Sequence, residues 1–194
     1  MSNLSDNIWF TRKARIQTSE RLLSNDNHSQ IMLIVYSLIS LILSIVLLKN
    51  TQAIGAYSDM IGVVMSLIIT IISLVIGGKN FKGRGLSLKN HYISLQRLYL
   101  RAIDAEANND LDKLAIIREE YNNILELEEN HHSIDDIVFR VLNRQNLTTR
   151  KPNKMEILIA YSYKVIRYAT IVFIYIFPFA MAIYLLIKNN IQIS

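Results

Sequence analysis

Three long runs without a charged residue dominate this sequence. Ile31 to Leu48 is 18 residues long, Met60 to Gly78 is 19 and Tyr168 to Ile187 is 20. An α-helix rises about 1.5 Å per residue and the hydrocarbon core of a bilayer is about 30 Å thick, so each run is long enough to cross a membrane. A soluble fold would have to bury all three, and the rest of the 194-residue chain is too short to cover them. We therefore predict three transmembrane helices.

Residues 1–30 are mostly polar and precede the first apolar run. No small-residue cleavage site follows that run, so we interpret it as an anchor and not as a signal peptide. Asp6 is a suitable N-cap for a short amphipathic helix that ends near Leu23. Its aromatic residues, Trp9 and Phe10, suit a membrane interface.

The distribution of Lys and Arg predicts the orientation. Basic residues are concentrated just before the first run and just after the second: Arg12, Lys13, Arg15, Arg21, Lys79, Lys82, Arg84 and Lys89. Segments rich in Lys and Arg stay in the cytoplasm. We expect the N-terminus and residues 79–167 to be cytoplasmic, and the loop 49–59 and the tail 188–194 to lie outside.

The cytoplasmic segment 79–167 separates its charges along the chain. Residues 79–103 carry six basic side chains and no acid, residues 104–136 carry eleven acids and two basic side chains, and residues 137–167 carry seven basic side chains and one acid. Juxtamembrane cations are attracted to anionic headgroups. The net charge of +5 is thus explained by the membrane, and we expect no direct nucleic-acid partner.

Apolar residues recur at helical spacing in this segment, from Leu88 to Ala102 and from Leu111 to Ile124. Asn108, Asn109 and Asp110 predict a stop and an N-cap between these helices, which would form an antiparallel hairpin. Ser133 begins a third helix, and Lys151-Pro152-Asn153 breaks the chain before the last span. The predicted fold is an all-α membrane protein: a transmembrane hairpin (31–48 and 60–78), a cytoplasmic antiparallel helical module and a third transmembrane helix (168–187).

Small and hydroxyl residues form a stripe on each of the first two spans. The first stripe is Ser37, Ser40 and Ser44, and the second is Gly62, Ser66, Thr70, Ser73 and Gly77. Such stripes permit close helix packing in lipid. They also suit the lining of a water-filled path, which would require several copies around an axis. Both interpretations stay open here. Phe177-Pro178-Phe179 predicts a kink in the third span, to which we assign a peripheral, lipid-facing role.

Catalytic motifs are largely missing. Gly78 to Gly83 has the glycine spacing of a phosphate-binding loop, but Arg84 and Gly85 stand where Lys and then Ser or Thr are required. Glu128 and His132 are four residues apart, with His131 nearby, yet no zinc motif completes them. The chain has no cysteine. We expect no metal, no cofactor and no enzymatic activity.

The acidic stretch is instead the candidate surface for a partner or for control. Its residues are Glu126, Glu128, Glu129, His131 and Asp135. A cationic partner would relieve the repulsion between these carboxylates in a symmetric assembly.

The sequence resembles the SLATT family, bacterial two-helix membrane proteins associated with defence systems. The resemblance rests on the string from Ile8 to Arg15, which includes Trp9, Thr11 and Arg12, and on Tyr121 to Leu125 with Glu129-Asn130-His131. It implies an inner-membrane effector that permeabilises or depolarises the membrane when a sensor detects a phage. Such a sensor would be a co-encoded nucleotide-producing enzyme or reverse transcriptase. The third span is an addition to the two-helix pattern.

We therefore expect a homo-oligomeric effector that acts on the lipid bilayer of the bacterial inner membrane. One alternative is a membrane-anchored binding or signalling module without a pore. A second alternative is a metal-dependent membrane enzyme that uses Glu128, His131 and His132.

Overall fold

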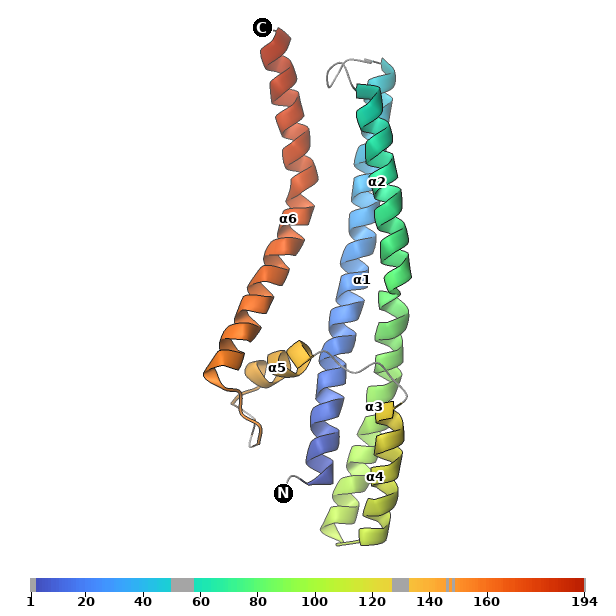
Figure 1. The fold of residues 1–194 in the computed structure, drawn as a ribbon, viewed down its shortest axis with the longest axis vertical. Helices are drawn as coiled ribbons and strands as arrows, with labels where there is room; N and C mark the ends of the chain where they lie inside the picture. Colours follow the sequence, from blue (N-terminus) through green and yellow to red (C-terminus); the bar gives the residue numbers. More distant parts are fainter. Residues whose placement is uncertain (1–2, 50–57, 127–132, 146, 148, 194) are drawn as a thin grey trace. The chain divides into compact units, whose positions relative to one another are not determined.

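The computed structural model describes residues 3–49, 58–126, 133–145, 147 and 149–193, and every regular element in these ranges is an α-helix (Figure 1). The helices are α1 (Leu4–Lys49), α2 (Ser58–Lys79), α3 (Phe81–Ala107), α4 (Leu111–Glu126), α5 (Ser133–Leu142) and α6 (Lys154–Ile193). Three helical stretches are long and apolar enough to cross a membrane: Leu4–Lys49, Met60–Ala107 and Lys154–Met181. The predicted all-α class with three apolar helices is confirmed.

The chain folds as two compact units. Residues 1–24 and 82–164 form one, which we call the polar unit, and residues 25–81 and 165–194 form the other, which we call the apolar unit. The apolar unit contains the three charge-free runs. Its aliphatic side chains are widely exposed, for example Leu41 at 57% and Val63 at 69%. Exposed apolar surface of this extent is typical of a lipid-facing protein.

The N-terminal segment differs from the prediction of a separate short helix. α1 runs without a break from Leu4 to Lys49, because no glycine or proline interrupts it. Its first part also lies inside the polar unit, where Ile8 is fully buried and Phe10 is 2% exposed. The placement of Trp9 and Phe10 at a membrane interface was therefore wrong. These side chains pack against Phe139 of α5, with ring centroids 5.6 and 6.5 Å away.

The predicted hairpin of α3 and α4 is confirmed, and α1 completes a three-helix core with it. The core consists of Ile8 from α1, Leu95, Leu98, Ala102 and Ala105 from α3, and Ile117 from α4. Asp110 caps α4, since its Oδ1 accepts a hydrogen bond of 3.1 Å from the Lys113 amide. Asn109 makes the turn with a positive φ of 52°, a conformation that asparagine tolerates better than most residues.

α5 connects two further parts of the polar unit. On one side Phe139 packs with Phe10 and Leu147, and on the other Val138 and Val141 pack with Ala160 in the first turns of α6. A ten-residue helix is too short to be stable alone. These two contacts therefore hold α5 in place.

A buried ion pair fixes α5 to α1. Asp135 is 1% exposed and accepts hydrogen bonds from Nε and Nη2 of Arg21 at 2.8 and 3.0 Å, and from Thr18 Oγ1 at 2.9 Å. The prediction that Asp135 lies on a partner surface was wrong. An isolated buried carboxylate is unfavourable in a protein interior, so it is placed where cationic and hydroxyl donors satisfy it.

The glycine-rich string after the second run is helical. Gly78 lies in α2 and Gly83 and Gly85 in α3, with a single left-handed residue, Asn80 (φ 44°), between the helices. A Cβ on Gly85 would come within 3.0 Å of Leu23 Cγ. Gly85 thus permits the close approach of α1 and α3, where Ser19 donates a hydrogen bond of 2.8 Å to the Gly85 carbonyl. This glycine-rich string therefore belongs to two helices and provides a helix contact.

Replacing Asp135 with alanine should unfold the polar unit more easily. Arg21, whose side chain is 13% exposed, would lose the Asp135 carboxylate, and breaking a buried pair costs about 3 kcal/mol or more. The measurement is denaturant unfolding in detergent, followed by the fluorescence of Trp9, the only tryptophan. Asp112→Ala, at an exposed position of α4, should change the unfolding free energy by less than about 0.5 kcal/mol. Equal stability of the two variants would contradict the role of the pair.

Candidate functional site

The two hydroxyl stripes meet at one point in the apolar unit. Ser40 of α1 is 8% exposed, and its Oγ lies 3.5 Å from Ser66 Oγ of α2. Around this contact is a shallow groove of about 290 Å³. The groove is lined by Ser37, Ser40, Leu41, Ser44, Ser66 and Ile69.

Three of the stripe hydroxyls bond to their own helices. Ser44 donates to the Ser40 carbonyl at 2.9 Å, Ser66 to the Gly62 carbonyl at 3.1 Å and Thr70 to the Ser66 carbonyl at 2.9 Å. Bonding to the carbonyl four residues earlier lets Ser and Thr reside in a membrane helix without a second partner. These three hydroxyls therefore do not require a fixed contact with another helix.

Most of the second stripe is open in the single chain. Thr70, Ser73 and Gly77 are exposed, and a Cβ on Gly77 would meet nothing within 4 Å. At Gly62 a Cβ would make only an ordinary contact of 3.6 Å with Leu47 Cδ1. Close packing between α1 and α2 thus centres on Ser40 and Ser66. The remainder of the stripe is available to other surfaces.

α6 contacts α1 through polar groups that the sequence analysis did not identify. Pro178 lies inside α6 and has no N–H, so the carbonyl of Ile174 loses its helical donor. The Tyr36 hydroxyl of α1 donates to this carbonyl at 3.0 Å. The spacing of Pro178 and Ile174 identifies the free carbonyl, but only the fold shows which donor reaches it.

Two more polar contacts join the same helices. His28 Nδ1 lies 3.2 Å from the Tyr175 hydroxyl, and Arg167 donates to the Asn25 side chain at 3.0 Å. The third span thus makes polar contacts with α1, while its side chains Phe173, Phe177 and Phe179 stay exposed, as expected of a lipid-facing helix. The aromatic residues of the span indicated lipid exposure, but one of them, Tyr175, contacts His28 of α1.

The N-terminal string from Trp9 to Arg15 has a structural position. The Thr11 hydroxyl lies 2.6 Å from the Tyr121 hydroxyl of α4. Arg15, only 3% exposed, donates to the Ile124 carbonyl at 3.2 Å, near the end of α4, where carbonyls lack helical donors. Arg12 is half-buried beside them. Thr11 and Arg15 thus hold α1 against α4.

Only part of the predicted control surface can be placed. Glu126 is exposed at the end of α4, whereas Asp135 is buried as described above. Glu128, Glu129, His131 and His132 lie outside the described residues. In the part of the chain that is described, no group of three or more His, Cys, Asp or Glu residues could hold a metal ion.

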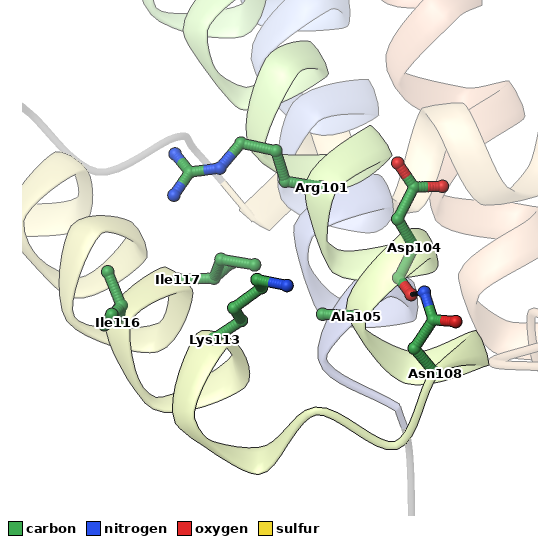
Figure 2. Close-up of a pocket in the computed structure, with 7 residues that line it drawn as sticks. All are labelled: Arg101, Asp104, Ala105, Asn108, Lys113, Ile116 and Ile117. Carbon is green, nitrogen blue, oxygen red and sulfur yellow. Dashed lines mark hydrogen bonds between the residues drawn. The ribbon is translucent and has the colours of Figure 1, made fainter.

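The tip of the hairpin contains a cavity of about 420 Å³ (Figure 2). Its floor is Ala105 and Ile117, and its rim includes Arg101 and Lys113. Both cations are already paired, Arg101 with Glu120 at 2.6 Å and Lys113 with Asp110 at 2.7 Å. The cavity therefore offers little uncompensated charge to an anionic ligand.

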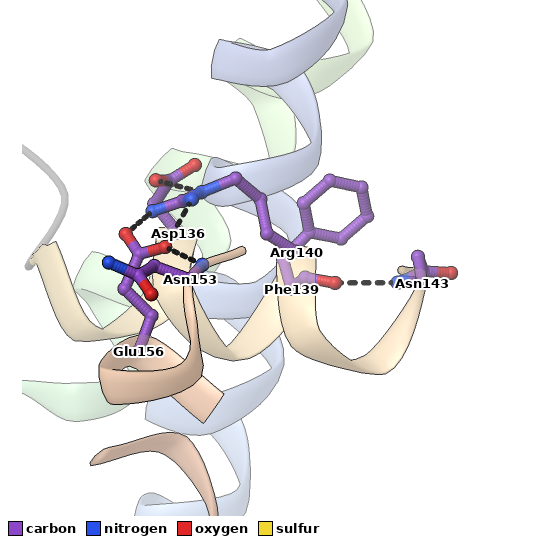
Figure 3. A network of polar contacts seen from close by, with 6 residues as sticks. All are labelled: Asp136, Phe139, Arg140, Asn143, Asn153 and Glu156. Carbon is purple, nitrogen blue, oxygen red and sulfur yellow. Dashed lines mark hydrogen bonds and ion pairs between the residues drawn. The ribbon is translucent and has the colours of Figure 1, made fainter. Parts of the chain in front are cut away.

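A second charged network joins α5 to the start of α6 (Figure 3). Arg140 pairs with Asp136 at 2.9 Å and with Glu156 at 2.5 Å. Hydrogen bonding to Glu156 raises the pKa of the Arg140 guanidinium above its ordinary value. Glu156 also accepts the Asn153 amide at 2.8 Å, and so caps α6. This joint connects the polar unit to the helix that continues into the apolar unit.

Comparison with known proteins identifies the family. The sequence profile of the SMODS and SLOG-associating 2TM effector domain family 5 matches residues 1–186. The chain belongs to this family. No curated protein and no solved structure matches this SLATT protein.

The region matched by the family profile includes most of α6. The third apolar helix, which we expected as an addition to the family pattern, therefore lies within the matched region. Membership supports a membrane effector of defence systems.

Tyr36→Phe should weaken the contact between α1 and α6. The Ile174 carbonyl would lose its donor in hydrocarbon, at a cost of about 1 kcal/mol. Thermal unfolding in detergent measures the change, and Tyr168→Phe at an exposed position is the matched control. In a Pro178→Ala background, residue 178 regains an N–H, so the same Tyr36 change should cost less. An equal cost in both backgrounds would contradict this account.

Acidification should weaken the Arg101–Glu120 pair. Hydrogen bonds from Arg101 lower the pKa of Glu120 below its ordinary value of 4.5. A carboxylate with a lowered folded pKa stabilises the fold above about pH 4.5, and this contribution is lost as the pH falls through the lowered value. The pair is exposed, so the effect is below about 1 kcal/mol.

Unfolding measured from about pH 6 to about pH 3 tests this dependence. Glu120→Gln should show a smaller loss of stability on acidification than the unmodified chain. Glu119→Gln, which alters the neighbouring exposed carboxylate, should retain the full loss. Identical pH profiles for all three proteins would contradict the pKa assignment.

Proposed function

We propose that this SLATT protein oligomerises in the bacterial inner membrane and permeabilises or depolarises it when a co-encoded sensor signals. The observation that carries the proposal is the open hydroxyl stripe on α2. Thr70 and Ser73 are exposed in the single chain on an otherwise apolar helix. In an assembly of several copies these faces would meet around an axis and line a path for water and ions.

The two-unit fold supports the predicted topology. Residues 1–24 belong to the same compact unit as residues 82–164, so both lie on one side of a membrane that the α1–α2 hairpin enters. The basic residues that flank the hairpin favour the cytoplasm for that side. α6 then carries the C-terminus out.

The polar unit supplies a place for the signal to act. α5 bonds to α1 through Asp135 and to α6 through Arg140. The exposed acidic end of α4, at Glu126, precedes the start of α5 by a few residues in the sequence. A sensor that binds there would therefore bind next to α5 along the chain. A shift of α5 would then reach both helices that enter the membrane. The proposal involves no catalytic step, and the sensor is a nucleotide-producing enzyme or a reverse transcriptase.

The test is depolarisation in bacteria that carry a potential-sensitive dye, with and without the co-encoded sensor. Thr70→Leu replaces a stripe hydroxyl with an aliphatic group, and it should reduce depolarisation by about tenfold or more at equal expression. Val64→Leu, on the opposite face of α2, is the matched control and should leave depolarisation unchanged.

If Thr70→Leu and Ser66→Leu both depolarise like the unmodified chain, the path-lining role is wrong. A membrane-anchored signalling module without a pore would then explain the fold better, since its stripe hydroxyls need no aqueous contact.

A further inference from the structure

Two exposed stripes on the polar unit carry opposite charge. The α3 stripe alternates cations with aliphatic residues at helical spacing: Lys82, Leu86, Lys89, Ile93, Arg97 and Leu100. The α4 stripe has acids at positions seven residues apart, with Ile116 and Asn123 between them: Asp112, Ile116, Glu119, Asn123 and Glu126. All eleven residues are exposed in the single chain.

Four charges of the two stripes make no ion pair with the residues that the structure describes. Among the described residues, neither Lys89 nor Arg97 on α3 forms an ion pair, and neither does Glu119 nor Glu126 on α4. The neighbouring Arg101 by contrast pairs within the chain. The cationic and anionic stripes thus complement each other, and these four charges are unpaired within the described part of the chain.

The aliphatic members are more exposed than a solvated helix face requires. Leu86 is 43% exposed, Ile93 42%, Leu100 51% and Ile116 54%. A helix that faces only water carries polar residues at such positions. Apolar residues flanked by charges are typical of a helix that packs against another helix.

Each stripe points away from the core of its own chain. The α3 stripe lies opposite the buried Leu95 and Ala102, and the α4 stripe lies opposite Ile117. A single hairpin therefore presents them on two different outer faces. A contact between different patches of identical subunits is heterologous, and it closes into a ring when the rotation permits.

The positions of the charges along the hairpin match for copies at the same level. Counted from Asn109 in the turn, Arg97 is 12 residues away and Glu119 is 10, while Lys89 is 20 and Glu126 is 17. At about 1.5 Å per residue these offsets are about 3 and 4.5 Å, within the reach of long side chains. Leu100 is 9 residues from Asn109 and Ile116 is 7, so these two lie at similar levels, nearer the turn than either charged pair.

We propose that the α3 stripe of one copy binds the α4 stripe of the next copy, so that the polar units form a ring in the cytoplasm. Arg97 would pair with Glu119 and Lys89 with Glu126, and Leu100 would contact Ile116 nearer the turn. This inference rests on the oligomer of the proposed function and specifies its interface.

The test uses single cysteines in the full chain, which has none of its own. Two versions of the chain are co-expressed, one with Leu100→Cys and a first tag, the other with Ile116→Cys and a second tag. The isolated membranes are then oxidised. Disulfide-linked dimers that carry both tags are expected. Each variant alone should give none, because a heterologous contact brings Leu100 opposite Ile116 and not opposite itself. Leu100→Cys with Leu142→Cys, an exposed residue of α5, is the control pair.

Charge reversal tests the complementarity. Arg97→Glu in both cysteine chains should reduce the mixed dimer about fivefold, equivalent to about 1 kcal/mol. Adding Glu119→Arg to both chains should restore it. Arg118→Glu, on α4 but outside the α4 stripe, should have no effect.

Three results would overturn the interface. Crosslinking of Leu100→Cys with itself would indicate a two-fold contact through α3. Absence of the mixed dimer, with depolarisation intact, would refute this interface and leave the proposed function standing. If the mixed dimer is absent and Arg97→Glu abolishes binding of the sensor, the α3 stripe binds the sensor and not a second copy. Mixed dimers in a chain that never depolarises membranes would support the ring and refute the pore.

Discussion

Hydrocarbon offers no hydrogen-bonding partner, so polar groups that lie in it have to be satisfied within the protein. Helices meet this requirement for the backbone, and the hydroxyls of Ser44, Ser66 and Thr70 meet it by bonding to their own helices. Pro178 creates the one exception that the described helices show clearly, and Tyr36 of α1 supplies the missing donor to Ile174. The same constraint that makes the spans helical therefore also connects α6 to α1.

The polar unit follows a different rule, because water and buried charge both contribute to it. Arg21 and Asp135 form a pair that joins α1 to α5, and Arg140 joins α5 to α6 through Glu156. α5 is thus held by two charged contacts and two apolar ones. Any signal that displaces this short helix acts on two helices that continue into the membrane.

Periodicity and charge predicted most of the elements. The apolar runs predicted the three membrane helices, and the break at Asn108 to Asp110 predicted the α3–α4 hairpin, because these features depend on local sequence alone. The continuity of α1 was missed because Asn25, Asp26 and Asn27 are weak helix formers, while the flanking segments hold the helix together. Local sequence carries no information about such tertiary support.

The candidate site was harder to predict because burial depends on distant residues. Asp135 belongs to an acidic stretch of sequence, yet Arg21 and Thr18, more than a hundred positions earlier, determine that it is buried. The Tyr36–Ile174 contact likewise joins residues 138 positions apart. The hydroxyl stripes are defined by spacing on single helices, and so the sequence predicted them correctly as faces. Which faces meet between copies is a property of the assembly.

The central claim is that the open stripe of α2 lines a water-filled path in the active assembly. Because the chain contains no cysteine, Thr70→Cys and Ser73→Cys each introduce a single thiol, and Val64→Cys places one on the opposite face. The decisive measurement is the rate at which a charged, membrane-impermeant thiol reagent labels each of them in cells, with and without the sensor. The account predicts rapid labelling at residues 70 and 73 only when the sensor is active, and none at residue 64. Equal labelling at all three positions, or none at residues 70 and 73 in depolarised cells, would contradict it.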